Sequence, residues 1–329
     1  MNKIKSAFVS NDPKNIGYVY SNGRREIIED LTNSHNEIIS EKNFDEKLDV
    51  LSEIEVIFST WGMPCFSENQ LNAMPNLKAV FYAAGATDNF VRPLLARGIT
   101  VCSAWRENAI PVAEFTVSQI ILACKGYFQN VISYRRAVKI QDFSNLYVGQ
   151  GIYNTKIILL GDGAIAHRVM EMLQNCYKLD VTMVASREQV RKISFDQAFK
   201  EGYVISNHLP NREDNQKVFN EELFRSMPYG ATFINTGRGA QVDEEAIVKV
   251  LSERKDLVAL LDVTEPEPVE INSPLLTCPN ILITSHIAGS LNNEVVRMAD
   301  SAIEEFKRYA SGEKCQHTVS EDILITSVK

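Results

Sequence analysis

The sequence lacks the features that mark a metal-binding, disulfide-linked or membrane-spanning protein. Its six cysteines are widely scattered and include no Cys-x-x-Cys pair, which predicts free thiols in a reducing compartment and no metal site. No apolar run is long enough to cross a bilayer, and the first ten residues lack the apolar core of a signal peptide. We therefore expect a cytoplasmic protein with no membrane partner.

The chain also has no surplus of basic residues. Its 34 Lys and Arg are outnumbered by 42 Asp and Glu, which gives a net charge of -8. Non-specific binding of nucleic acid depends on basic side chains that displace counterions from phosphates, so a nucleic-acid partner is not expected. Apolar residues make up 45% of the chain, as in ordinary globular proteins, and 329 residues are enough for two domains.

Short apolar runs alternate with polar, helix-like stretches in two successive parts of the chain. In the first part, strands are predicted at 6–10, 56–59, 79–82 and 99–102. In the second part, they are predicted at 156–160, 181–185, 203–206, 231–234, 257–262 and 281–284. Helical spacing predicts helices over 112–128, 164–175, 243–253 and 292–309, with a polar stretch over 134–154. This alternation favours an α/β fold with parallel sheets and crossover helices.

A glycine-rich turn opens the second part. The strand at 156–160 leads into Gly161-Asp-Gly-Ala-Ile-Ala166 and then a helix, in the order that a dinucleotide-binding turn requires. Gly161 permits the tight turn and Gly163 lets the backbone approach a pyrophosphate. The pyrophosphate would bind the helix N-terminus at Ala164 and Ile165. Methyltransferases share this pattern, and Asp162 adds a negative charge to the turn unless its side chain points away.

The end of the next strand bears on the choice of cofactor. A fold that prefers NAD usually carries an acid there, which bonds the ribose 2′-hydroxyl. This chain has Ser186 and Arg187 instead, and a hydroxyl with a guanidinium suits a 2′-phosphate. We predict NADP(H) as the preferred cofactor, with NAD(H) possible. A solvated loop arginine is the alternative interpretation of Arg187.

Three polar residues follow successive strands of the second part. Arg238, Glu267 and His286 each lie in a turn marked by glycine or proline, and parallel sheets gather ligands at the carboxyl ends of their strands. Reduction of a 2-keto acid needs a cation to hold the carboxylate and polarise the carbonyl. It also needs an acid to protonate the oxygen, and a carboxylate that fixes the imidazole tautomer. The three residues fit these roles.

These segments resemble the D-isomer-specific 2-hydroxyacid dehydrogenases, which include glyoxylate/hydroxypyruvate reductases. The resemblance covers most of the chain from 76 to 312, and five segments carry it: 112–114, 206–210, 235–243, 262–268 and 285–290. It implies two doubly wound parallel-sheet domains and a homodimer. A flavodoxin-like substrate domain would span 1–110 and 310–329. A Rossmann NAD(P)-binding domain would be inserted between them at 111–309.

The resemblance also implies roles for single residues. Arg238 would bind the substrate, Glu267 would support the histidine and His286 would be the acid/base. Further cofactor contacts are implied at the strand ends by His208, Leu209, Pro210, Thr236, Gly237, Arg238, Asp262 and His286. The substrate carboxylate would bind backbone N–H groups of Ala84, Gly85 and Ala86. Trp61 would close over the substrate tail, unless it packs on its own domain.

Three other functions remain open at this point. An NAD-linked dehydrogenase of the same fold is disfavoured by the missing acid, and a formate-type relative by Glu267, where such relatives carry glutamine. A dinucleotide-sensing binding protein of the same fold would bind cofactor with little turnover. A methyltransferase has no use for Arg238 and His286 at strand ends.

Overall fold

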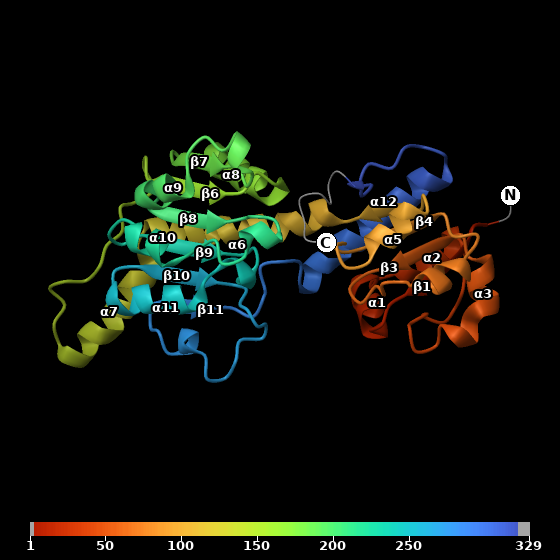
Figure 1. The fold of residues 1–329 in the computed structure, drawn as a ribbon, viewed down its shortest axis with the longest axis horizontal. Helices are drawn as coiled ribbons and strands as arrows, with labels where there is room; N and C mark the ends of the chain where they lie inside the picture. The colour runs from red at the N-terminus through yellow and green to blue at the C-terminus, as the bar shows by residue number, and fades with distance from the viewer. Residues whose placement is uncertain (1–2, 322–329) are drawn as a thin grey trace. The chain divides into compact units, whose positions relative to one another are not determined.

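The computed structural model describes residues 3–321, and the chain divides into two compact units (Figure 1). The first unit takes Met1–Ala109 and Ser290–Lys329, and the second takes Ile110–Gly289. Both are α/β units with parallel sheets, as the alternating pattern indicates. The sequence places the second boundary near residue 310, whereas the chain re-enters the first unit at Ser290.

The first unit is built on a five-stranded parallel sheet of order β2-β1-β3-β4-β5. Its strands are β1 (Lys5–Val9), β2 (Asn33–Ser34), β3 (Val56–Ser59), β4 (Ala79–Tyr82) and β5 (Thr100–Ser103). Its helices are α1 (Pro13–Val19), α2 (Arg24–Leu31), α3 (Leu48–Glu53), α4 (Glu68–Asn72), α5 (Val91–Ala96) and α12 (Val295–Ala310). Every residue of β3 and β4 is buried, as expected for central strands covered on both faces. A capping box formed by Ser67 and Gln70 opens α4.

Helix α12 explains why the boundary lies at 289/290. Its apolar face packs on the first sheet, where the ring of Phe306 lies 5.2 Å from that of Phe58 and 5.6 Å from that of Phe81. Met298 and Ala299 on the same face are fully buried. The sequence predicts this amphipathic helix but cannot tell which sheet its apolar face covers, because both sheets offer an apolar surface.

The chain after α12 returns to the edge of the first sheet. Val319 N donates to Val101 O at 2.8 Å, and Ser103 N donates to His317 O at 3.0 Å. The tail therefore pairs with β5 in antiparallel fashion and covers an edge strand. The expected return of the tail holds for the described part, while 322–329 of the predicted substrate domain lie outside the described residues.

The second unit contains a six-stranded parallel sheet of order β11-β10-β9-β8-β6-β7. Its strands are β6 (Lys156–Leu160), β7 (Asp180–Val184), β8 (Val204–Asn207), β9 (Thr232–Asn235), β10 (Val258–Leu261) and β11 (Ile281–Ile283). The strand order reverses beside β6, since β7 lies on one side of it and β8 on the other. The carboxyl ends at such a switch point form the usual ligand crevice of a doubly wound sheet.

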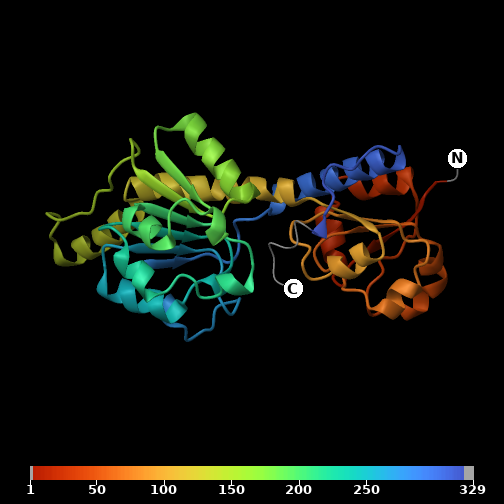
Figure 2. The ribbon, with the colours of Figure 1, turned by 45° about the horizontal axis from the view of Figure 1, so that its top comes forward.

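Helices cover both faces of this second sheet (Figure 2). They are α6 (Trp105–Cys124), α7 (Tyr127–Ile140), α8 (Ala164–Cys176), α9 (Phe195–Glu201), α10 (Glu221–Ser226) and α11 (Glu244–Glu253). Alternate residues of β6 face opposite cores. Ile157 and Leu159 belong to the core shared with α6 and α8, while Ile158 and Leu160 belong to the core shared with α9, α10 and α11.

Helices α6 and α7 differ from the sequence prediction. The apolar spacing predicts one helix over 112–128, but α6 starts at Trp105 and α7 continues to Ile140, with Gly126 at φ 71° between them. Only Gln129 and Ala137 of α7 are buried, too few to leave a helical apolar pattern. Within residues 3–321 no single helix is long and apolar enough to cross a membrane, although α6 and α7 pass that test together as a pair bent by 54°.

Candidate functional site

The segments that follow β9, β10 and β11 stay side by side beyond the ends of their strands. Asp262 N donates to Asn235 O at 2.9 Å, and His286 N donates to Asp262 O at 2.9 Å. The first bond extends the parallel ladder one residue past the end of β10, and the second ties that residue to His286, three residues past the end of β11. The turns that carry Arg238, Glu267 and His286 therefore start from adjacent points of one sheet edge.

Asp262 organises the histidine turn. Its side chain is buried and accepts hydrogen bonds from Thr284 Oγ1 at 2.6 Å, Ile287 N at 2.8 Å and Ala288 N at 2.9 Å. The backbone of His286 is left-handed, with φ 57°. Because a non-glycine residue resists this conformation, the three bonds to Asp262 are the contacts that stabilise it. The sequence implies only that Asp262 contacts the cofactor, so this second role was missed.

The side chains of His286 and Glu267 form a close pair. Nδ1 of His286 lies 2.6 Å from Oε1 of Glu267, and the two side chains are 51% and 42% exposed. The carboxylate orients the imidazole and assigns the Nδ1 proton, so Nε2 is the nitrogen that can serve a ligand. The structure thus brings together two of the three residues that the sequence groups in one reaction.

Arg238 lies in a turn that its neighbours hold tightly. Asn235 accepts from Gly237 N at 3.0 Å through Oδ1 and donates to Arg238 O at 3.0 Å through Nδ2. The half-buried guanidinium donates from Nη1 to Gly237 O at 2.8 Å, so most of its N–H groups stay available. A Cβ on Gly239 would lie 2.1 Å from the backbone of Thr264. The arginine turn therefore packs directly on the segment that leads to Glu267.

A cradle for a phosphate group opens at the end of β6. Gly161 has φ 117°, and a Cβ there would lie 2.4 Å from His208 O, so only glycine fits. Gly163 begins helix α8 with no side-chain cap, and among the described residues no atom lies within 4 Å of where its Cβ would stand. The first N–H groups of α8, at Ala164 and Ile165, have no partner inside the helix. A dinucleotide pyrophosphate fits this open N-terminus.

The segment after β8 lies against the glycine turn. His208 N donates to Leu160 O at 2.7 Å, Leu209 N donates to Asn207 Oδ1 at 3.0 Å, and Pro210 O accepts from Gln241 Nε2 at 2.8 Å. His208 Nε2 lies 3.0 Å from Ser206 Oγ, and burial lowers the pKa of His208 to about 4. The imidazole is therefore neutral at pH 7 and fixed beside the cradle.

The low pKa of His208 predicts a pH-dependent loss of stability. Its ordinary pKa is about 6.5, so between that value and about 4 the unfolded chain binds a proton that the folded chain does not. Stability is then lost as the pH falls, by up to about 1.4 kcal/mol per pH unit. We expect the urea midpoint of His208→Gln to fall less than that of the wild type between pH 7 and pH 5. Exposed His167→Gln is the control, and parallel curves for all three proteins would contradict the prediction.

The end of β7 carries one cation more than the sequence interpretation includes. Ser186 is buried and Arg187 is exposed at this tip. Arg191 folds back onto it, donating from Nε to Ala185 O at 3.0 Å and from Nη2 to Ser186 O at 2.7 Å. Its guanidinium also lies 3.8 Å from the ring centroid of Phe195. A basic residue four positions after Arg187 was the signal that could have found it.

The loop that follows β4 in the first unit presents backbone donors. Thr60 Oγ1 donates to Ala83 O at 2.8 Å, and Ser103 Oγ lies 2.9 Å from Ala84 O and 2.8 Å from Gly85 O. Within residues 3–321 the N–H groups at 84, 85 and 86 donate no hydrogen bond. Because the loop carbonyls are held by buried hydroxyls, its free N–H groups are in a position to donate to an anion. The sequence predicts this loop but misses the two hydroxyls.

Trp61 packs partly against the core of its own unit, and its carbonyl accepts from Ser10 Oγ at 3.0 Å and Asn15 Nδ2 at 3.1 Å. This geometry matches the alternative in which Trp61 is a packed loop aromatic.

Thr236 and Gly237 follow β9 directly, next to Asn235, and are partly exposed. They therefore lie on the same sheet edge as Arg238.

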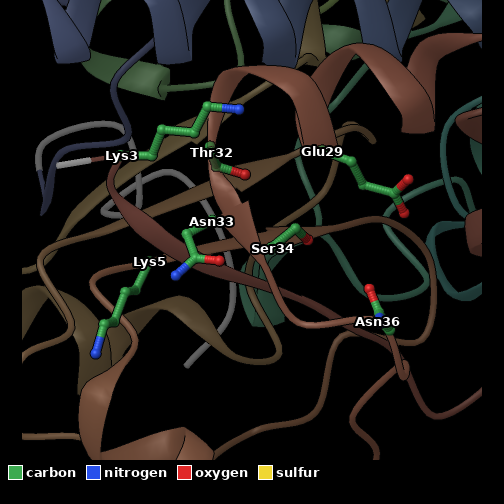
Figure 3. A pocket seen from close by; sticks show the side chains of 7 residues that line it. All are labelled: Lys3, Lys5, Glu29, Thr32, Asn33, Ser34 and Asn36. Carbon is green, nitrogen blue, oxygen red and sulfur yellow. The ribbon is translucent and has the colours of Figure 1, made fainter.

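Two other features of the first unit fall outside this site. A cavity of about 520 Å³ lies where β1 and β2 begin, at the amino ends of the strands (Figure 3). It is lined by Lys3, Lys5, Glu29, Thr32, Asn33, Ser34 and Asn36.

The second feature is a cluster of side chains that could ligate a metal. Ligand atoms of Cys102, Glu305 and Cys315 lie within 4.8 Å of one another. The Glu305 carboxylate already accepts from Gln316 N at 2.7 Å and His317 N at 3.0 Å, so these contacts account for the cluster.

Comparisons with known proteins agree with this geometry. Residues 121–288 match the family described as D-isomer specific 2-hydroxyacid dehydrogenase, NAD binding domain. Glyoxylate/hydroxypyruvate reductase B of Yersinia pestis (strain Pestoides F) is 25% identical over 293 residues, covering 86% of this chain and 89% of that protein. Two solved structures each cover 96% of this chain and their own full length at a TM-score of 0.73. They are D-lactate dehydrogenase with NAD+ from Lactobacillus jensenii, 21% identical, and an acyclic imino acid reductase (Bsp5) with NADPH and D-Arg, 18% identical.

Proposed function

Because the chain belongs to the D-isomer-specific 2-hydroxyacid dehydrogenase family, we propose that it reduces a 2-keto acid to a D-2-hydroxy acid, and catalyses the reverse reaction, with His286 as acid/base. The observation that carries the proposal is the 2.6 Å contact between His286 Nδ1 and Glu267 Oε1. With Nδ1 committed to the carboxylate, Nε2 is the nitrogen that donates a proton to the keto oxygen, or accepts it in the reverse direction. A bound nicotinamide dinucleotide supplies or accepts the hydride.

Arg238 stabilises the oxygens of the substrate in this proposal. Its guanidinium is always charged, and within residues 3–321 most of its N–H groups have no hydrogen-bond acceptor. A planar fork of donors can grip a carboxylate oxygen and a carbonyl oxygen together. The interaction between the guanidinium and the carbonyl oxygen becomes more favourable as negative charge develops on that oxygen during hydride transfer. Arg238 thus lowers the barrier as well as binding the substrate.

In this proposal the dinucleotide binds at the cradle at the end of β6. The α8 N-terminus and the glycine turn hold the pyrophosphate, while the segments after β8, β9 and β10 contact the nicotinamide half. Ser186 and Arg187, together with Arg191, support a preference for NADP(H) over NAD(H), because a guanidinium attracts a 2′-phosphate. Arg191 also keeps the tip of β7 in place.

The loop at 83–88 is proposed to hold the substrate carboxylate, and Ser103 to position that loop. Ser103→Ala frees two loop carbonyls, so the N–H groups lose their fixed direction. We expect KM for the keto acid to rise about three- to tenfold, the equivalent of one or two ordinary hydrogen bonds. We expect kcat to change little and the melting temperature to fall by a few degrees, because the two carbonyls lose a buried partner.

Steady-state kinetics separate positioning from folding. Ser103→Thr keeps the hydroxyl and should recover most of the lost KM. Ser52→Ala removes an exposed hydroxyl that donates to Asp49 O in the same unit, and should leave KM unchanged. A three- to tenfold fall in kcat for Ser103→Ala, with no change in KM, would show that the loop does not hold the substrate carboxylate in the ground state.

A homodimer and a cytoplasmic location complete the proposal. Seven large apolar side chains on α7 and the loop after it are at least half exposed: Tyr127, Tyr134, Val138, Ile140, Phe143, Val148 and Tyr153. The loop is held in place, since Tyr147 Oη lies 2.7 Å from Tyr203 Oη. An ordered apolar surface of this kind favours burial against a second copy. A solution mass of twice the 37.0 kDa chain is expected.

The experiment that tests the proposed function is oxidation of NADPH and NADH in the presence of glyoxylate, hydroxypyruvate, pyruvate and bulkier 2-keto acids. Turnover with the D-enantiomer as product is expected for at least one of them. The competing function is a dinucleotide-sensing binding protein of the same fold. Tight binding of a dinucleotide without turnover on any 2-keto acid would favour that sensor.

A further inference from the structure

The glycine turn and the tip of β7 lie side by side. β6 and β7 pair in parallel up to Leu160 and Val184, and Gly161 N then donates to Val184 O at 2.8 Å. The next residues on each side, 162 and 185–187, continue from this bond. In a dinucleotide fold the tip of this second strand is where the adenosine ribose is recognised. We call the tip of β7, residues 185–187, the ribose corner. A side chain from the glycine turn can reach it.

Asp162 reaches that corner. Its Oδ1 lies 3.5 Å from Ser186 N, so the carboxylate is directed toward the tip of β7. Asp162 is exposed and can meet a ligand at this point. Because the carboxylate is directed toward the tip of β7, its negative charge points away from the pyrophosphate cradle. The acid that β7 lacks at its own end is thus supplied from the preceding turn.

Opposite charges meet at the ribose corner as a result. Arg187 is exposed there, and the guanidinium of Arg191 is fixed by two carbonyls of the tip. These cations attract a 2′-phosphate, whereas the Asp162 carboxylate repels it and accepts a hydrogen bond from a ribose hydroxyl. The balance between them sets the ratio of the affinities for NADPH and NADH.

We propose that Asp162 is a specificity-determining residue that takes the place of the missing acid of β7 and keeps NADH usable. The proposal rests on the dinucleotide site of the proposed function. The carboxylate favours the ribose of the unphosphorylated dinucleotide and limits the advantage that Arg187 and Arg191 give to NADPH. Cofactor preference in this chain is therefore decided by the first variable position of the glycine turn as well as by the strand tip.

Asp162→Asn tests the proposal, because it removes the charge and keeps the size of the side chain. Dissociation constants for NADPH and NADH are measured by dinucleotide fluorescence, without substrate. We expect NADPH to bind about tenfold more tightly, the equivalent of about 1.4 kcal/mol, because one repulsive charge pair is removed. NADH should bind equally or a few-fold more weakly. Arg187→Ala should move the ratio in the opposite direction.

Asp180→Asn is the matched control. It removes the same charge from the other end of β7, where Asp180 pairs with Lys156 at 3.1 Å, and should leave the ratio unchanged. An equal change in both constants on Asp162→Asn would overturn the proposal, because Asp162 would then act on the phosphates that both dinucleotides share. No change in either constant would overturn it as well. Failure of the wild type to bind either dinucleotide would instead reject the proposed function, and this inference with it.

Discussion

Replacing His286 with asparagine is expected to lower kcat by a factor of about 10²–10⁴, the usual contribution of a positioned acid/base. Asparagine keeps a polar side chain of similar reach but cannot deliver a proton at neutral pH. The backbone of the turn is held by Asp262, so the variant should fold with its turn intact. Steady-state kinetics give kcat, and fluorescence titration should show that dinucleotide affinity stays within a few-fold of the wild type.

Two glutamates of the same turn, Glu267 and Glu265, provide a matched pair of variants. Glu267→Gln breaks the charge-assisted contact with His286 Nδ1 and should lower kcat by a smaller factor than His286→Asn. Glu265→Gln makes the same change two residues earlier, where the side chain is exposed, and should be nearly silent. Turnover of His286→Asn at the wild-type rate would contradict the acid/base role. Equal effects of the two glutamate variants would contradict the role of the pair.

Replacing Arg238 with lysine is expected to lower kcat/KM by a factor of about 10²–10³, the loss that follows removal of one preorganised donor to a developing oxyanion. Lysine keeps the positive charge, but its ammonium is a single point and cannot grip two oxygens in one plane. The loss should fall on kcat as well as on KM, because the interaction strengthens in the transition state. Steady-state kinetics with one keto acid measure both parameters.

Arg225→Lys is the control for this substitution. Arg225 lies in a surface ion-pair network with Glu221 and Glu253, and such exposed pairs contribute little. The control variant should keep wild-type kinetics and nearly wild-type stability. An Arg238→Lys variant with unchanged kcat and a raised KM would show that the guanidinium binds the substrate without stabilising the transition state.

The sequence predicts the strands and the glycine turn well because these depend on local patterns. Strands that are buried on both faces leave continuous apolar runs, as at 156–160 and 79–82. The turn at Gly161 is readable because only glycine fits against His208 O. The two-residue strand β2 at Asn33–Ser34 leaves no such run, and the sequence misses it.

The misses have a common physical cause, which is that they depend on contacts distant in sequence. The domain boundary depends on which sheet receives the apolar face of α12. The roles of Ser103 and Asp262 depend on carbonyls and N–H groups that lie about 20 or more residues away along the chain. Such side chain–backbone bonds leave no periodic signal, because any serine or aspartate can make them once the fold places a partner nearby.

The direction of Asp162 is a related case. From sequence alone, its negative charge is expected to oppose a pyrophosphate in the same turn. The ladder between β6 and β7 decides the matter, because it sets residue 162 beside Ser186. The sequence identifies an aspartate at position 162. Its contact with Ser186 depends on the register of β6 and β7, which the sequence does not give.

The most direct test of the central claim follows the hydride itself. The wild type is incubated with NADPH or NADH that carries deuterium at both C4 positions of the nicotinamide, together with the best 2-keto acid. Mass spectrometry then locates the label in the product. One deuterium on C2 of a D-2-hydroxy acid is the predicted result. A product without deuterium, or bound dinucleotide that is never consumed, would contradict the assignment of a hydride-transferring 2-keto acid reductase.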